Sequence, residues 1–197
     1  MGRPLDEAGL DTIFRTARTY NGYTDAPVTE ADVRRIYDLL KMGPTSANMQ
    51  PARFVWLLSQ QGRDRLAALS SATNGAKIRA APAAVIIASD AGFPEHLPWL
   101  FPHDQTAASW FSDPEKRREH AFRNASLQGA YLLIAARALG FDTGPMSGFD
   151  NDAVDAEFFA GQPEVKSNFI ATLGHGDPAT IFGRLPRPEF ERFNRLA

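Results

Sequence analysis

The chain has 197 residues, of which 44% are hydrophobic and 22% are charged, and its formal net charge at pH 7 is −2. These proportions are typical of a globular protein, and we expect a single domain over residues 1–197. A nearly neutral chain without a run of Lys or Arg disfavours nucleic-acid and anionic membrane surfaces as partners. The sequence contains no cysteine, which excludes disulfides, thiolate metal sites and cysteine nucleophiles.

The N-terminal residues lack the apolar core of a signal peptide. No apolar run approaches the roughly 20 residues that a helix needs to span a bilayer. We therefore expect a cytoplasmic protein that has no membrane partner.

The spacing of apolar residues predicts helices and strands in alternation. We expect helices over 5–18, 30–42, 62–72, 114–140 and 151–159, a turn or short helix over 74–79, and buried strands around 53–58, 83–88 and 168–173. Residues 90–112 are rich in Pro and aromatics and have no clean period, which is typical of a packed lid. The mixture predicts an α+β fold.

The second half of the helix expected over 114–140 is apolar on nearly every side. A helix of this kind is buried all round, which is difficult within one small subunit, so we expect it to pack against a partner. The charged tail beyond Pro186 also carries Phe190, Phe193 and Leu196, which we expect to lie along a neighbouring subunit.

A polar loop between a helix and a strand is the most informative segment of the chain. Gly43 and Pro44 end the helix, and the loop then presents two hydroxyls and two carboxamides, those of Thr45, Ser46, Asn48 and Gln50. Amides donate and accept hydrogen bonds together, which suits a polar heteroaromatic ring. A well-capped turn is the alternative interpretation of this loop alone.

Four segments, in order, carry a family likeness. They are Gly43–Pro51, Asn74-x-x-Lys77, Leu139–Asp150, and Leu173–Asp177 followed by Arg184-Leu185-Pro186. Together they resemble the FMN-dependent nitroreductase family, whose signature Pro-Ser-x-x-Asn-x-Gln-Pro is similar to the first segment. Gly43–Asn48, Phe122–Asn124 and Gly144–Asp150 are most similar to the branch that includes the malonic semialdehyde reductase of pyrimidine breakdown.

The resemblance implies a nitroreductase-like central sheet flanked by helices and an intertwined homodimer with two flavin sites at its interface. It also implies the residues that bind FMN: Arg18, Thr19, Asn21, Thr45, Ser46, Asn48, Gln50, Asn74, Lys77, Pro145, Met146, Ser147, Gly148 and Arg184.

Within this set, Arg184 is the first candidate for the FMN phosphate, because a guanidinium meets a phosphate with a planar fork of donors. Arg18 is the second, although the chain departs from the family's Arg-x-Ser-x-Arg/Lys-x-Phe: the first Arg is shifted by one position and Asn21 replaces the second. Asn74 and Lys77 match the pair at the flavin's pyrimidine edge. Surface positions for Arg184 and Lys77 remain the alternatives.

The segment Pro145–Gly148 corresponds to the family's main-chain contacts to flavin N5, and a structural turn is its alternative. Hydride would pass from NADH or NADPH to FMN and then, by ping-pong kinetics, to a small electron-poor acceptor. The branch likeness implies malonic semialdehyde, which is reduced to 3-hydroxypropionate, with nitroaromatics or quinones as side substrates. For an anionic substrate, the lid around His96–His103 or Arg123 would supply a cation, and either solvent or Thr45 would supply the proton.

A flavin-binding sensor or storage protein on the same fold is the alternative function. Three other interpretations fail. Gly174–Ala179 imitates a dinucleotide fingerprint but leaves no room for a βαβ unit. The four histidines lack metal-ligand spacing, so we expect no metal. Ser147 does not lie in a Gly-x-Ser-x-Gly elbow.

Overall fold

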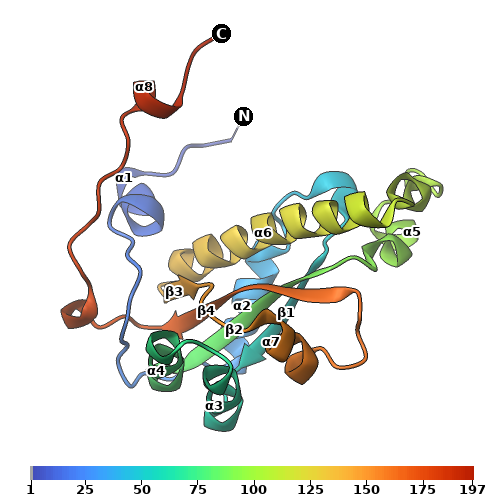
Figure 1. The fold of residues 1–197 in the computed structure, drawn as a ribbon. Helices are drawn as coiled ribbons and strands as arrows, with labels where there is room; N and C mark the ends of the chain where they lie inside the picture. Colours follow the sequence, from blue (N-terminus) through green and yellow to red (C-terminus); the bar gives the residue numbers. More distant parts are fainter. Residues whose placement is uncertain (1) are drawn as a thin grey trace.

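A four-stranded antiparallel sheet with the strand order β1-β2-β4-β3 forms the centre of the protein, whose computed structural model describes residues 2–197 (Figure 1). The strands are β1 (Ala52–Leu57), β2 (Ala83–Asp90), β3 (Asp142–Met146) and β4 (Val165–Gly174). The α-helices are α1 (Glu7–Leu10), α2 (Glu30–Leu40), α3 (Gln60–Ala68), α4 (Ala72–Ala80), α5 (Leu97–Leu100), α6 (Pro114–Ala138), α7 (Asn151–Phe158) and α8 (Phe190–Phe193). The predicted α+β fold is confirmed.

Helices cover both faces of the sheet, because successive side chains of β2 point to opposite faces. Val85 and Ile87 pack with α2 and α6 on one face. Ala84 and Ile86 pack with α3, α4 and α7 on the other. Every residue of β2 is therefore buried, as its nearly continuous apolar sequence predicts.

The start of α2 follows from its sequence. The hydroxyl of Thr29 accepts a hydrogen bond from the amide of Asp32 at 3.2 Å, and the carboxylate of Asp32 accepts one from the amide of Thr29 at 3.0 Å. This reciprocal capping box satisfies two amides that a helix start leaves free. The helix presents Val33, Ile36 and Leu40 to the core at helical spacing and ends at Leu40.

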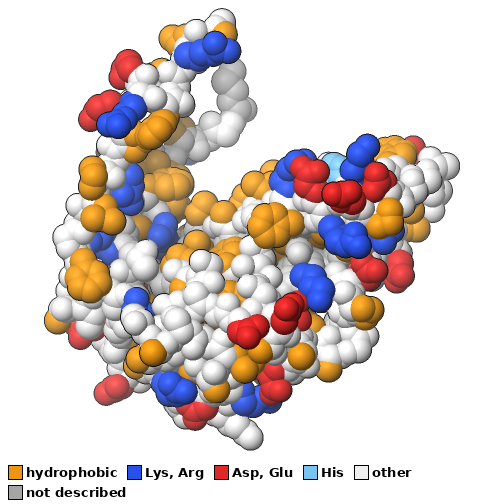
Figure 2. Space-filling model, viewed as in Figure 1, with side chains coloured by type: hydrophobic (Ala, Val, Ile, Leu, Met, Phe, Trp, Pro, Cys, Tyr) orange, Lys and Arg blue, Asp and Glu red, His pale blue; other side chains and the backbone are white. Residues whose placement is uncertain are grey.

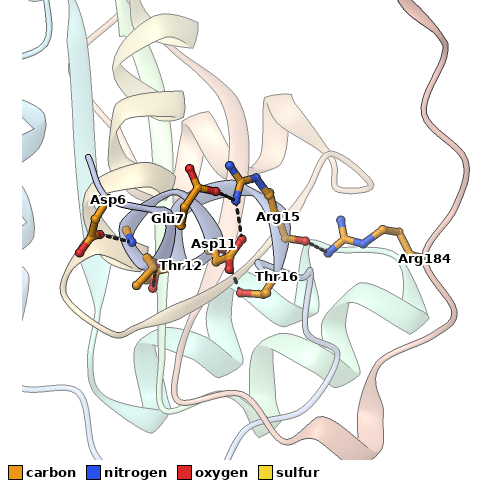
Figure 3. A network of polar contacts seen from close by, with 9 residues as sticks. Asp6, Glu7, Asp11, Thr12, Arg15, Thr16 and Arg184 are labelled. Atoms are coloured by element: carbon orange, nitrogen blue, oxygen red, sulfur yellow. Dashed lines mark hydrogen bonds and ion pairs between the residues drawn. The ribbon is translucent and has the colours of Figure 1, made fainter. Parts of the chain in front are cut away.

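The helix expected over 5–18 is shorter than predicted and irregular. It consists of α1 and a π-helical turn over Asp11–Arg15, in which the amide of Thr16 donates to the carbonyl of Asp11 at 2.9 Å. Neither element contains a buried residue, so no apolar packing supports a longer helix. Ion pairs of Arg15 with Glu7, at 2.6 Å, and with Asp11, at 3.0 Å, connect the two (Figure 3).

The long helix α6 exists as predicted, and within one chain it is buried on one side. Gln128, Gly129 and Leu132 are buried toward the sheet and α2, whereas Leu127 is 42% exposed and Phe122 is 55% exposed. One apolar stripe of α6 thus faces the core, and a second faces outward.

Two segments differ from their predicted form. Strand β3 was not expected, because Gly144 and Pro145 interrupt any alternation of apolar residues; its pairing with β4 alone creates it. Residues 90–112 are not an irregular loop but contain α5 and 3₁₀-helices over Phe93–His96 and Ala107–Phe111. Pro94 and Pro98 lie in the first turn of the Phe93–His96 helix and of α5, where a missing N–H costs no hydrogen bond.

The N- and C-terminal segments stand away from the rest of the chain and run near one another (Figures 1 and 2). Both are rich in exposed apolar side chains, as Figure 2 shows, and we call the two segments together the apolar arm. They include Leu5, Phe14, Phe182, Leu185, Phe190, Phe193 and Leu196, which are between 53% and 90% exposed. Among residues 2–197, no helix combines the length and apolar character needed to cross a membrane.

Candidate functional site

The segment after α1 and the segment after β4 meet at the free edge of β3. Thr19 forms a β-bridge with Thr143, and the side-chain amide of Asn21 donates to the carbonyl of Thr180 at 3.0 Å. Arg184 donates to the carbonyls of Arg15, at 2.7 Å, and Ala17, at 3.1 Å (Figure 3).

The guanidinium of Arg18 in turn donates to the carbonyl of Phe182. The two phosphate candidates, Arg18 and Arg184, therefore lie where the same two backbone segments cross. Each has further guanidinium donors beyond the bonds that hold these segments together.

A third arginine, Arg137 in the last turn of α6, faces this corner and was missed from the sequence. It donates to the carbonyl of Ile13 at 3.2 Å, and its Nε is buried without a partner among the described residues. Burial lowers the pKa of its guanidinium; the carboxylate of Asp142 opposes that shift and the charge of Arg184 adds to it. A buried donor without a partner, next to a second cation, fits a phosphate. The phosphate oxygens would accept the hydrogen bond, and their negative charge would offset the two positive charges.

Farther along β3, the strand meets the start of α4. The side-chain amide of Asn74 donates to the carbonyl of Gly148 at 3.1 Å, and the amide of Ser71 donates to the same carbonyl at 3.0 Å. A Cβ at position 148 would stand 2.7 Å from Nδ2 of Asn74, so the close approach requires glycine. Ser71 and Gly148 also line an open depression of about 630 Å³.

The remaining predicted residues of this group lie along the same edge. Lys77 of α4 is half-buried, and its side chain makes no hydrogen bond or ion pair with another described residue. Pro145 and Met146 belong to β3, and the exposed Ser147 follows directly. We call this set the β3-edge group: Arg18, Thr19, Asn21, Asn74, Lys77, Pro145, Met146, Ser147, Gly148 and Arg184.

The other four predicted residues lie in the Thr45–Gln50 loop, whose backbone is strained. Ala47, Asn48 and Gln50 have φ angles of 48°, 50° and 42°. The left-handed conformation costs non-glycine residues about 1–2 kcal/mol each, although Asn tolerates it better than most. Inside the loop, the hydroxyl of Thr45 accepts a hydrogen bond from the amide of Gln50 at 3.2 Å.

Two buried amides of α6 hold this loop from below. Oδ1 of Asn124 accepts from the amide of Ser46 at 2.8 Å, and Oε1 of Gln128 accepts from the amide of Ala52 at 2.8 Å. Nε2 of Gln128 donates to Oε1 of Gln50 at 2.5 Å. Gln128 was not predicted as a functional residue, and Asn124 was named only within the segment Phe122–Asn124 that carries the family likeness. The signal that could have found them is two amide side chains four residues apart in an otherwise apolar helix.

A cavity of about 520 Å³ opens beside the loop. Asn48 and Gln50 line it together with His96, Trp99 and Arg53. The loop is joined to the lid by a hydrogen bond of 2.8 Å from the side-chain amide of Asn48 to the carbonyl of Leu100.

Of the expected lid aromatics, Trp99 is 78% exposed at this cavity. Phe93 is fully buried in a small core with Met49 and Leu97, so a role for Phe93 as a mobile cover is wrong.

The two groups lie at opposite edges of the sheet. The register connects Pro145 to Ala171, Val85 and Trp56 in turn, which is three strand spacings, or about 14 Å. Gln50 lies six residues before Trp56, roughly 20 Å farther along an extended chain. A separation of about 24 Å between Pro145 and Gln50 follows, and the same spacings put Gly148 about 17 Å from Gln50, so one chain does not bring the two groups together.

The comparisons with known proteins agree with this architecture. A "Putative NADH dehydrogenase/NAD(P)H nitroreductase" of Xanthomonas oryzae pv. oryzae is 55% identical over 197 residues, and all of both chains is covered. A protein of the same name from Caulobacter sp. is 54% identical over 192 residues, covering 98% of both chains.

Solved structures share the fold. A "putative nitroreductase ydfN" from Bacillus subtilis has a TM-score of 0.86 at 21% identity, covering 98% of this chain and 100% of its own. A "putative nitroreductase in complex with FMN" from Exiguobacterium sibiricum has a TM-score of 0.86 at 19% identity, covering 100% and 99%. The model of the Nitroreductase family matches residues 14–175, and the chain therefore belongs to the Nitroreductase family.

Proposed function

We propose that the protein is an FMN-dependent NAD(P)H oxidoreductase, and the observation that carries the proposal is the β3-edge group. Its arginines lie at one end of the free edge of β3, beside Thr143, and Asn74 lies at the other end, on Gly148. Five residues separate Thr143 from Gly148, about 16 Å in an extended strand. A phosphate at the first end and a ring at the second suit an elongated flavin mononucleotide.

When bound, FMN supplies a two-electron carrier that takes hydride from NAD(P)H and returns it to an acceptor. Arg184, Arg18 and Arg137 hold the phosphate by charge-assisted hydrogen bonds. Lys77 places a positive charge near the ring's pyrimidine edge, where it stabilises the reduced, anionic form. The free backbone edge of β3 lies along the ring.

We further propose that a second copy of the chain completes each site. Gln50 is about 17 Å from Gly148 and about 24 Å from Pro145 in one chain, so the loop of one protomer would serve the flavin of its partner. The outer stripe of α6 and the apolar arm would supply the surface for an intertwined homodimer, because neighbouring apolar side chains that are exposed together often mark an interaction surface.

For the acceptor, we propose a small anionic carbonyl compound such as malonic semialdehyde, with nitroaromatics and quinones as side substrates. Three basic side chains at the 520 Å³ cavity support an anion: Lys41, Arg53 and His96. Arg53 pairs with Asp90 at 2.6 Å and Lys41 pairs with Asp38 at 2.5 Å, so both would contribute a positive charge that a carboxylate already partly offsets. Arg123 pairs with Glu119 on the exposed side of α6 and does not line this cavity.

Thr45 remains only a proposed proton donor. Its oxygen already accepts a hydrogen bond from the amide of Gln50, while its own proton is free for a ligand. Solvent is the other source of the proton.

The test is anaerobic mixing of the purified, flavin-loaded protein with NADH or NADPH. Rapid bleaching of the flavin absorbance, followed by its recovery on addition of malonic semialdehyde, is the expected result. Protein that binds no FMN refutes the proposal. Flavin that binds but is not bleached would instead favour a sensor or storage protein.

A further inference from the structure

The Thr45–Gln50 loop adopts a backbone that its own residues disfavour. Ala47 and Gln50 hold left-handed φ angles of 48° and 42°, where a Cβ crowds the following carbonyl. Such a conformation persists only where surrounding contacts over-determine it. The contacts that hold it come from two side chains of α6.

Asn124 and Gln128 lie one helical turn apart, so both point from α6 toward the loop. Each is 3% exposed. Asn124 accepts from the amide of Ser46, before the left-handed residues, and Gln128 accepts from the amide of Ala52, after them, both at 2.8 Å. The two bonds therefore fix the loop at both ends.

The carboxamide of Gln128 has only one possible orientation. The backbone N–H of Ala52 can only donate, so Oε1 of Gln128 must face it and Nε2 must face Gln50. Oε1 of Gln50 accepts the hydrogen bond from Nε2 of Gln128 at 2.5 Å. Nε2 of Gln50 donates to Oδ1 of Asn48 at 3.1 Å and to the carbonyl of Lys41 at 3.4 Å, so the whole Gln50 side chain is held within the loop beside the cavity that Asn48 and Gln50 line.

We infer that Asn124 and Gln128 are positioning residues that hold the Thr45–Gln50 loop in its ligand-binding conformation. The inference rests on the proposed function, because the ligands that the loop would contact are the FMN and the electron acceptor of the proposed reaction. Gln128 also lines the cavity beside the loop, whereas Asn124 does not line it.

The variants separate hydrogen bonding from packing. Asn124→Leu and Gln128→Met keep approximate volume and remove the bonds, and each should raise the Kd of FMN about tenfold, equivalent to ~1.4 kcal/mol. Ala47→Gly should restore binding to Asn124→Leu, because glycine adopts positive φ without strain.

Hydrogen exchange in the flavin-free protein provides a readout that does not depend on cofactor. The amides of Ser46 and Ala52 should exchange faster in Asn124→Leu and Gln128→Met, respectively, than in the wild type. Ile86→Val, on the opposite face of the sheet from α6, is the packing control and should change neither these two amides nor the Kd.

The outcomes are distinct. Wild-type protein that binds no FMN refutes the proposed function, and the role of the two amides is then decided by the exchange data. Unchanged exchange in the Leu and Met variants overturns the inference. So does faster exchange with unchanged FMN affinity, because the loop would then not belong to the binding site. A failure of Ala47→Gly to recover binding in Asn124→Leu also overturns it.

Discussion

The backbone of Gly43 lies directly against the ring of Tyr131: a Cβ at position 43 would stand 2.1 Å from Cδ2 of that ring. The hydroxyl of Tyr131 also donates to the carbonyl of Pro44 at 3.0 Å. These contacts dock the end of α2 on α6 immediately before the Thr45–Gln50 loop.

Gly43→Ala should therefore push Tyr131 away and lower the free energy of unfolding by about 1–3 kcal/mol, the usual cost of overpacking. Urea titration measures the loss. Adding Tyr131→Ala to Gly43→Ala removes the clash, so the double variant should be more stable than the two separate losses predict. Strictly additive losses would show that the ring does not limit position 43.

Arg184→Ala should weaken FMN binding by about tenfold to a hundredfold, because it removes a charge-assisted contact worth roughly 1.5–3 kcal/mol. Arg18→Ala and Arg137→Ala should act in the same direction. Arg187→Ala is the matched control, since that side chain bonds only to the neighbouring carbonyls of Leu185 and Pro186. Fluorescence titration with FMN gives each Kd, and equal values for Arg184→Ala and Arg187→Ala would place the phosphate elsewhere.

The protein should be a dimer at micromolar concentration, and a charge on the outer stripe of α6 should prevent its assembly. Leu127→Glu or Ala130→Glu introduces a carboxylate that a dry interface cannot solvate. Ala160→Glu, at an exposed position after α7, is the control and should stay dimeric. Light scattering with an absorbance detector measures mass and flavin content together. A flavin-loaded monomer of the wild type would contradict the shared site.

Tyr23 should make the protein lose stability at alkaline pH. Its hydroxyl bonds to that of Thr172 at 2.7 Å, and burial raises the pKa of the phenol above its ordinary value of 10.0. The folded state thus favours the protonated form, so this contribution is complete below pH 10.0 and decreases as the pH rises above it.

Tyr23→Phe should cost about 0.5–1.5 kcal/mol near neutral pH through the lost hydrogen bond. It should also flatten the decrease in stability above pH 10.0. Chemical unfolding at several pH values tests both effects, with the exposed Tyr37→Phe as control. A decrease of the same slope in Tyr23→Phe would assign the alkaline loss to other groups.

Trp99→Ala should change turnover and the KM for the acceptor much more than FMN content or melting temperature. The indole is 78% exposed and lines the cavity beside Gln50, so its loss removes little core packing. Phe93→Ala is the contrasting variant, because this ring is fully buried and its removal should cost about 3–5 kcal/mol. Stopped-flow measurement of each half-reaction distinguishes them. Wild-type rates in both half-reactions of Trp99→Ala would exclude a gating role.

Local chemistry was readable from the sequence alone. The buried strand expected around 83–88 and the polar loop before Pro51 each depend on residues close together in the chain, and both form as expected. Family membership was readable for the same reason, because its motifs are short segments in a fixed order.

Tertiary structure decided what depends on distant partners. Strand β3 exists because β4 offers it hydrogen bonds, although Gly144 and Pro145 give no strand signal. Nothing local tells whether Gln128 faces solvent or a strained loop, or that Arg137 ends beside Arg184. The sheet order alone places the loop and the β3-edge group at opposite edges, because strand pairing, not sequence proximity, sets distances across a sheet.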